Sequence, residues 1–233
     1  MLIVNNLTSY YSNIKILKNL SFNLNQGQVL CLLGRNGAGK TTTLKSIMGL
    51  VDKTRGSILF NNEKLSGIPA HYIPKKGIGY VPQGRRLFSE LTVEENLEIG
   101  LLARKKGKDT KDKVLSMFPR LKERINQISG TLSGGEQQML AIGRSLVINP
   151  SVIMLDEPSQ GLAPMIVEDV KEMLIKLKKE GMSIILVEQN LKTALDVADR
   201  VYILDQGEIV FEGKSEELSK NKKLTLKFLG VST

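Results

Sequence analysis

A glycine-rich segment near residue 40 carries the residue types that hold a phosphate chain. We name it the phosphate loop, and it consists of Gly34, Arg35, Asn36, Gly37, Ala38, Gly39, Lys40, Thr41 and Thr42. Glycines let backbone N–H groups turn towards an anion, Lys40 can reach the outer phosphates, and the Thr41 hydroxyl can ligate Mg²⁺. An apolar run, residues 29–33, leads into the loop, and residues 43–48 are typical of a helix that ends at Gly49. This strand, loop and helix predict a nucleoside-triphosphate site.

Two carboxylates follow a second apolar run. Asp156 and Glu157 come directly after residues 152–155, which suit a central parallel strand. Ligands bind at the carboxyl ends of such strands, so Asp156 is placed to hold Mg²⁺ directly or through water. Glu157 could accept a proton from an attacking water. The alternative is a strand that simply ends in a polar turn before Pro158.

A third segment has a helix-capping pattern with two glycines inside it. We name it the signature segment, and it consists of Leu132, Ser133, Gly134, Gly135, Glu136 and Gln137. Ser-x-x-Glu is a capping box, but glycines in the first helical positions weaken a helix by about 1 kcal/mol each. They do allow backbone N–H groups to approach an anion closely, with the helix dipole behind them. Because the phosphate loop already serves the chain's own nucleotide, we expect the signature segment to touch a nucleotide held by another subunit.

The remaining patterns predict an α/β fold. Short strands are expected at residues 2–4, 15–17, 20–24 and 57–60, which favour an antiparallel sheet beside the nucleotide core. A capping box at Thr92 begins a helix that we expect to run to about Lys106, and charged helical segments continue to Ile128 with a break at Pro119. Further strands are expected at residues 79–82 and 183–187, helices at 165–180 and 191–198, and a hairpin at 201–211.

We expect residues 1–233 to form a single nucleotide-binding domain. Its core, with the antiparallel β region, would comprise approximately residues 1–87 and 146–233, and approximately residues 88–145 would form an inserted α-helical subdomain.

Composition limits the function classes. The chain has 233 residues, 41% hydrophobic, with one cysteine, Cys31, and a net charge of +9. No run approaches the roughly 20 apolar residues of a membrane span, and the N-terminus lacks a signal-peptide layout, so we expect a cytoplasmic location. The basic residues are scattered without interleaved aromatics, which disfavours nucleic acid and favours a solvated basic surface near an anionic membrane face. The lone His71 has no cluster of metal-ligand residues around it in the sequence.

Taken in chain order, the phosphate loop, Gln83, the signature segment and Asp156-Glu157 resemble an ATP-binding-cassette ATPase over the whole chain. Longer stretches resemble the ATPase subunits of branched-chain amino-acid importers, namely residues 79–88, 132–143, 161–164 and 186–190. Subunits of urea-type importers share much of this, and residues 34–37 and 81–85 suit them equally. The resemblance implies a P-loop NTPase core with a mainly parallel sheet, a flanking antiparallel β subdomain and an inserted α-helical subdomain.

The resemblance also implies partners and cofactors. The chain would bind ATP and Mg²⁺, and would pair head-to-tail with a second cassette ATPase, either identical or paralogous. It would lie peripherally on the inner face of the cell membrane, against integral membrane permease subunits that receive solute from an external binding protein. Two rivals of another class stay open: a regulatory or RNA-associated cassette protein, and a nucleotide-binding module that signals without turnover.

Individual roles follow from the resemblance in the same way. Tyr11 matches the aromatic residue that stacks on adenine, and Ser133 and Gly135 match the groups that bind a γ-phosphate across the dimer. The expected catalytic residues are Lys40, Glu157 as general base, and Gln189 at the switch position. The expected Mg²⁺ ligands are Thr41, Gln83 and Asp156.

Two positions depart from the family pattern. The switch position is usually histidine and is Gln189 here, and the loop after Glu157 usually ends in aspartate and has Ala163. Glutamine can hydrogen-bond a phosphate oxygen but cannot carry the imidazolium charge. We therefore expect hydrolysis to depend more on Glu157 and on the partner's signature segment. The missing aspartate raises the alternative that the natural partner is a related subunit that supplies the complementary loop.

Overall fold

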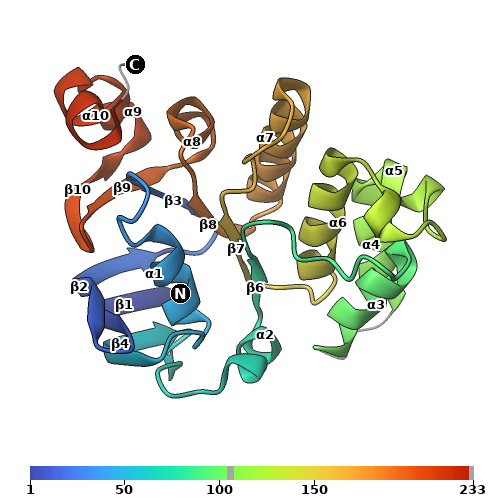
Figure 1. Cartoon of the computed structure of the whole chain (residues 1–233), viewed down its shortest axis with the longest axis horizontal. Helices are drawn as coiled ribbons and strands as arrows, with labels where there is room; N and C mark the ends of the chain where they lie inside the picture. Colours follow the sequence, from blue (N-terminus) through green and yellow to red (C-terminus); the bar gives the residue numbers. More distant parts are fainter. Residues whose placement is uncertain (104–107, 231–233) are drawn as a thin grey trace.

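The computed structural model describes residues 1–103 and 108–230. Two β-sheets enclose helix α1 (Lys40–Ile47), whose Leu44 and Ile47 are buried among side chains from both sheets. Figure 1 shows the two sheets to the left of a group of helices that spans α3 to α6. The helix that begins with Lys40 thus lies at the centre of the half of the molecule that contains both sheets.

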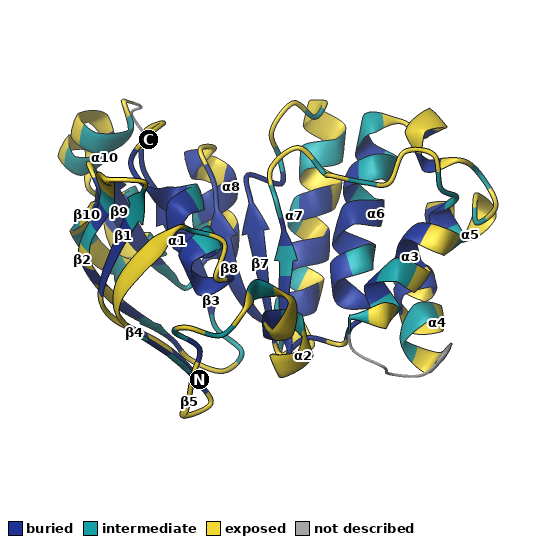
Figure 2. Cartoon of the chain, turned by 60° about the horizontal axis from the view of Figure 1, so that its bottom comes forward, coloured by how far each residue is buried: buried dark blue, intermediate teal, exposed yellow. Residues whose placement is uncertain are grey.

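The larger sheet has six strands in the order β10-β9-β3-β8-β7-β6. Strands β6, β7, β8, β3 and β9 are parallel, and β10 is antiparallel to β9. Both faces are covered, so Cys31 packs in one core and Leu30 and Leu32 in the other. Figure 2 shows β3, β7 and β8 as buried along their length. The strand bounds are β3 (Val29–Leu33), β6 (Ile78–Val81), β7 (Val152–Asp156), β8 (Ser183–Val187), β9 (Arg200–Asp205) and β10 (Glu208–Lys214).

The second sheet is antiparallel, in the order β2-β1-β4-β5. The expected separate strands at residues 15–17 and 20–24 are wrong, because both belong to one strand, β2. Asn19 has a left-handed φ of 56°, and the pairing register shifts between Leu7 and Ser9, opposite this point. An irregularity inside one strand was therefore mistaken for a break. The bounds are β1 (Leu2–Tyr11), β2 (Ile14–Leu24), β4 (Lys53–Phe60) and β5 (Glu63–Lys64).

Helix α6 packs beside β6, and helices α3, α4 and α5 pack on α6. The predicted capping box is present: Glu95 N–H donates to Thr92 Oγ1 and Thr92 N–H donates to Glu95 Oε2. The helix it begins ends at Leu102, whereas we expected about Lys106, and residues 104–107 lie outside the described residues. Pro119 occupies the first turn of a new helix, where its missing N–H costs little. The bounds are α3 (Val93–Leu102), α4 (Lys108–Met117), α5 (Pro119–Glu123) and α6 (Gly134–Leu146).

The remaining helices cover the large sheet and complete the chain. The apolar face predicted for the helix at 165–180 is present, with Val170, Leu174 and Leu177 in the core. No helix of the described residues has the length and apolarity that crossing a bilayer requires. The bounds are η1 (Ala70–Tyr72), α2 (Ile73–Lys76), η2 (Ser129–Thr131), α7 (Pro164–Lys179), α8 (Leu191–Val197), α9 (Ser215–Ser219) and α10 (Lys222–Leu229). The predicted α/β class, with a mainly parallel sheet and an antiparallel one, is confirmed.

Candidate nucleotide-binding site

The phosphate loop connects β3 to α1, and its backbone requires glycine at two positions. Gly34 has a φ of 149°, and a Cβ there would lie 2.3 Å from the carbonyl oxygen of Leu204. Gly39 caps α1 with a φ of 107°, and a Cβ there would lie 2.6 Å from Leu17 Cδ2. The loop can therefore approach its neighbours, and place its N–H groups around an anion, only because these side chains are absent.

Lys40 lies inside this loop and is only 4% exposed. Its Nζ donates to the carbonyl oxygens of Gly34 at 2.9 Å and Arg35 at 3.3 Å, and lies 3.5 Å from Glu157 Oε1. A buried lysine held by two carbonyls and one carboxylate presents its charge where a phosphate chain would follow the loop.

Asp156 ends β7 opposite the first turn of α1. Thr41 Oγ1 donates to Asp156 Oδ1 at 2.9 Å, and the Tyr80 hydroxyl lies 3.4 Å from Asp156 Oδ2. Burial raises the pKa of Asp156, the hydrogen bond from Thr41 opposes this shift, and the charge of Glu157 reinforces it.

These oxygen ligands fit Mg²⁺, which prefers one or two protein oxygens together with substrate phosphates and water. Among residues 1–103 and 108–230 no group of three or more His, Cys, Asp and Glu side chains could hold a metal alone. An ion bound by Thr41 and Asp156 would therefore depend on the nucleotide.

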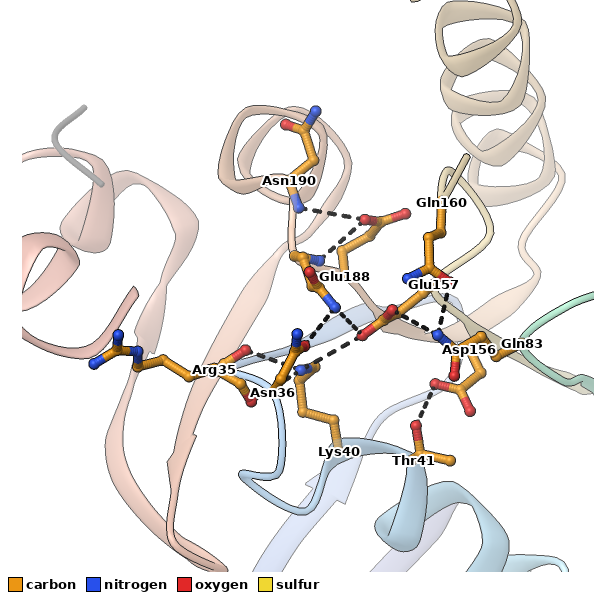
Figure 3. A network of polar contacts seen from close by, with 12 residues as sticks. Arg35, Asn36, Lys40, Thr41, Gln83, Asp156, Glu157, Gln160, Glu188 and Asn190 are labelled. Atoms are coloured by element: carbon orange, nitrogen blue, oxygen red, sulfur yellow. Dashed lines mark hydrogen bonds and ion pairs between the residues drawn. The ribbon is translucent and has the colours of Figure 1, made fainter. Parts of the chain in front are cut away.

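Glu157 lies at the centre of a polar network, and Figure 3 shows how its neighbours converge on it. It is 7% exposed and has a left-handed φ of 50°, which turns the chain sharply after Asp156. Its Oε1 accepts a hydrogen bond from Gln189 Nε2 at 2.7 Å, and its Oε2 accepts one from Gln83 Nε2 at 3.1 Å. Residues in such sparsely populated backbone conformations cluster at functional sites. A carboxylate fixed in this way can accept a proton from water beside a bound phosphate.

Gln83 follows β6 and reaches this network from the other side. Its Nε2 donates to Gln160 Oε1 at 2.6 Å as well as to Glu157. The amide thus donates to Glu157 and Gln160, and its expected role as an Mg²⁺ ligand beside Thr41 and Asp156 stays a prediction. Gln160 was missed by the sequence analysis, because only its position three residues after Glu157 could have indicated it.

Gln189 ties the network to the phosphate loop, because its Nε2 also donates to Asn36 Oδ1 at 2.7 Å. The preceding residue, Glu188, is 1% exposed and was also missed. Its carboxylate accepts N–H bonds from Ser159 at 3.2 Å, Gln189 at 3.1 Å and Asn190 at 3.4 Å. Burial raises the pKa of Glu188, and these hydrogen bonds act against the shift. A carboxylate directly after an apolar strand, as at Asp156, was the signal that could have found it.

Most of these groups, but neither Asp156 nor Glu188, line one pocket of about 420 Å³. Tyr11 lies in its wall together with Ile16, which the sequence analysis did not single out. The residues that line the pocket are Tyr11, Ile16, Asn36, Gly37, Ala38, Gly39, Lys40, Thr41, Thr42, Gln83, Glu157, Gln160 and Gln189.

The signature segment lies elsewhere, at the start of α6. Figures 1 and 2 both place α6 and α1 on opposite sides of strands β7 and β8. Ser133, Gly135 and Glu136 line a different hollow of about 440 Å³, beside Met165 and Asp169 of α7. The chain therefore brings the phosphate loop, Gln83, Asp156, Glu157 and Gln189 together. Ser133, Gly135 and Glu136 lie at a separate hollow, whereas Gln137 lines a third hollow together with Asp156 and Glu157.

Of the two departures from the family pattern, Gln189 belongs to this network, whereas Ala163 and the lone histidine lie outside it. Ala163 is exposed and caps α7 without a side-chain hydrogen bond. His71 lies in η1, where its ring contacts that of Tyr72.

Comparison with known proteins agrees with this geometry. The family described as "ABC transporter" matches residues 17–160. The chain is 46% identical to the high-affinity branched-chain amino acid transport ATP-binding protein BraG of Pseudomonas aeruginosa, over 99% of this chain and 100% of the relative. It is 37% identical to the probable branched-chain amino acid transport ATP-binding protein LivF of Archaeoglobus fulgidus, over 97% of each chain.

Solved structures give the same result for the fold. A nucleotide-free ATP-binding cassette from an ABC transporter superposes with a TM-score of 0.87 at 28% identity, over 100% of this chain and 99% of that one. The dimeric post-hydrolysis state of the ATP-binding cassette MJ0796, bound to ADP and Pi, superposes with a TM-score of 0.82 at 28% identity, over 92% of this chain and 99% of that one.

Proposed function

The chain belongs to the ABC transporter family of ATPases, and we propose that it powers a membrane importer for branched-chain amino acids. The observation that carries the enzymatic part is the position of Glu157, held by Gln189 and Gln83 and 3.5 Å from Lys40 Nζ. The solute is supported by two relatives whose names specify branched-chain amino acids and which match this chain over almost its whole length.

Hydrolysis uses the network around Glu157. Lys40 and the amides of the phosphate loop bind the phosphate chain, and Tyr11 packs against the base. Glu157 accepts a proton from the attacking water, while Gln83 and Gln189 donate N–H bonds that keep its two oxygens in place. Thr41, Asp156 and Gln83 would hold Mg²⁺, which would supply positive charge against the phosphates.

The active unit is a head-to-tail dimer. Ser133 and Gly135 line a hollow separate from the chain's own pocket, which supports their serving a nucleotide that another subunit holds. In α6 the N–H groups of Gly134 and Gly135 belong to the first turn, which has no acceptors within the helix. We assign them, with Ser133, to the γ-phosphate of the second copy's ATP. A dimeric relative of the same fold supports this arrangement.

The partners follow from the transport role. The chain would lie peripherally on the cytoplasmic face of the membrane, against separate permease subunits that a solute-binding protein supplies. Residues of about 88–145 would form the helical subdomain, and residues of about 1–87 and 146–233 the ATP-binding core. Gln83 lies shortly before the helical subdomain in the sequence. Its hydrogen bonds to Glu157 and Gln160 would therefore transmit the state of the nucleotide to that subdomain.

Uptake by the source cell tests the solute. Replacing Lys40 by alanine in the chromosomal copy should abolish high-affinity uptake of radiolabelled leucine, isoleucine and valine, and leave urea uptake unchanged. The matched control is Lys64→Ala, an exposed lysine in β5. Loss of urea uptake with intact leucine uptake would replace the proposed solute by urea. Intact uptake of all four would contradict an importer for either class.

A further inference from the structure

The signature segment contains a carboxylate whose charge is unfavourable for its proposed role. Glu136 occupies the first turn of α6, and its Oε2 accepts the Ser133 N–H at 2.9 Å while Ser133 Oγ accepts the Glu136 N–H at 3.3 Å. This capping box fixes the Ser133 side chain. It also places a negative charge within one helical turn of the N–H groups assigned to a phosphate. Two anions that share one helix start repel each other.

Arg124, at the end of α5, faces that carboxylate. Its Nε lies 2.8 Å from Glu136 Oε1, the oxygen that the capping box does not use. A second contact fixes the guanidinium, because Nη1 donates to Gln127 Oε1 at 2.9 Å. Gln127 in turn donates to Thr131 Oγ1 at 2.9 Å, in the turn that leads into the signature segment. Arg124 therefore spans from α5 to the helix start and to the chain just before it.

The state of Glu136 agrees with this pairing. Burial alone would raise the pKa of Glu136, but the hydrogen bonds with Ser133 and the charges of Arg124 and Arg120 hold it below its ordinary value. The carboxylate is thus ionised at neutral pH, and protonation does not remove the repulsion. A nearby cation must offset it instead.

We propose that Arg124 is the positioning residue that makes the signature segment an anion site, because it holds Glu136 in the capping box and offsets its charge. This inference rests on the proposed role of the signature segment in binding the γ-phosphate of a second copy's ATP. Arg124 acts on that phosphate through Glu136 and does not touch the chain's own pocket. Its loss should therefore affect ATP-dependent pairing of two copies and spare nucleotide binding by one copy.

The test uses the full chain with Glu157→Gln, which should bind ATP without consuming it because the proposed general base is removed, and follows dimerisation by light scattering as Mg²⁺-ATP is added. Arg124→Ala should raise the ATP concentration needed for half-maximal dimer about tenfold, the scale of one uncompensated charge near a partly exposed phosphate. Affinity for fluorescent ADP, which reports the chain's own phosphate loop, should not change. Lys122→Ala is the matched control, because it removes an exposed cation from the same helix.

A second substitution separates charge from structure. Glutamine at position 136 keeps the capping geometry and removes the charge, so Arg124→Ala with Glu136→Gln should dimerise at nearly the parent's ATP concentration. The defect of Arg124→Ala alone should also shrink as salt is added, because the repulsion is screened. A dimerisation defect caused by lost packing would be corrected neither by Glu136→Gln nor by added salt.

The outcomes distinguish the two proposals. If the Glu157→Gln parent does not dimerise with ATP, the proposed function fails. If the parent dimerises and Arg124→Ala dimerises equally well, the role of Arg124 is wrong. If Arg124→Ala is impaired and Glu136→Gln does not restore it, the arginine contributes packing alone and the charge argument is wrong.

Discussion

The side-chain amide of Gln189 donates to Glu157 Oε1 at 2.7 Å. The same nitrogen donates to Asn36 Oδ1 at 2.7 Å, so both N–H groups of the Gln189 amide are used. A neutral side chain thus joins the phosphate loop to the proposed general base. Because glutamine does not titrate, the Gln189 side chain stays neutral at every pH at which the protein is folded.

Gln189→Ala tests that link. Removing a donor that orients the base should lower ATP turnover by the assembled dimer about 100-fold, with little change in nucleotide affinity. Phosphate release and fluorescent-nucleotide binding measure the two quantities, with Gln26→Ala, an exposed glutamine outside the network, as control. Unchanged turnover would show that Gln189 has no part in hydrolysis.

Lys40→Ala should remove the charge that the phosphate loop presents to the nucleotide. We expect ATP affinity to fall about 100-fold or more, the usual loss when one partner of a buried charge pair is truncated. Isothermal titration with Mg²⁺-ATP measures this, and Lys64→Ala should bind like the native chain. Retention of ATP binding and turnover would contradict the assignment of the phosphate loop.

Thr41→Val keeps the shape of the side chain and removes the hydroxyl that pairs with Asp156. We expect the Mg²⁺ concentration for half-maximal hydrolysis to rise about tenfold, because one oxygen ligand is lost. A Mg²⁺ titration of phosphate release at saturating ATP measures the shift, with Thr54→Val, at the exposed end of β4, as control. Superimposable titration curves would exclude Thr41 as a ligand.

Glu188 gives a pH-dependent stability. Burial raises its pKa in the folded chain, so the folded state holds its proton more tightly than the unfolded state does. Its contribution to stability is therefore fully present below the unfolded pKa and is lost as pH rises through the folded pKa. The free energies of unfolding of the native chain and of Glu188→Gln are measured in urea at several pH values. As pH falls through this window, the free energy of unfolding of the native chain should rise relative to that of the variant. A constant difference, or one moving the other way, would contradict the raised pKa.

Local patterns were sufficient for most of the large sheet. Runs such as residues 152–155 and 184–187 are apolar throughout, as is typical of strands buried on both faces, and strands β7 and β8 were predicted to within a residue. The second sheet was harder, because Asn19 interrupts the alternation of β2 without ending the strand. Pairing with β1 continues past that point, and this partner is invisible to a local pattern.

In the site, too, residues in local sequence motifs were predicted, and residues that depend on partners distant in the sequence were not. The phosphate loop and the Asp156–Glu157 pair have local motifs, and the structure places both on one pocket or at its edge. Gln160 and Arg124 were missed because each acquires a role only through a residue brought to it by the fold, whereas Glu188 had a local signal, its position directly after an apolar strand. Gln160 meets Gln83, for example, across 77 positions of sequence. The roles assigned to the site residues stay predictions until variants are measured.

The central claim is that one copy's signature segment completes the other copy's nucleotide site. Light scattering of the Glu157→Gln chain, with and without Mg²⁺-ATP, tests it most directly when compared with the same chain carrying Ser133→Arg. We expect ATP to convert the first chain from monomer to dimer, and the second to bind ATP equally well but stay monomeric. Ser116→Arg, at an exposed position of α4, should leave dimerisation intact. An ATP-dependent dimer that forms equally well with Ser133→Arg would contradict it.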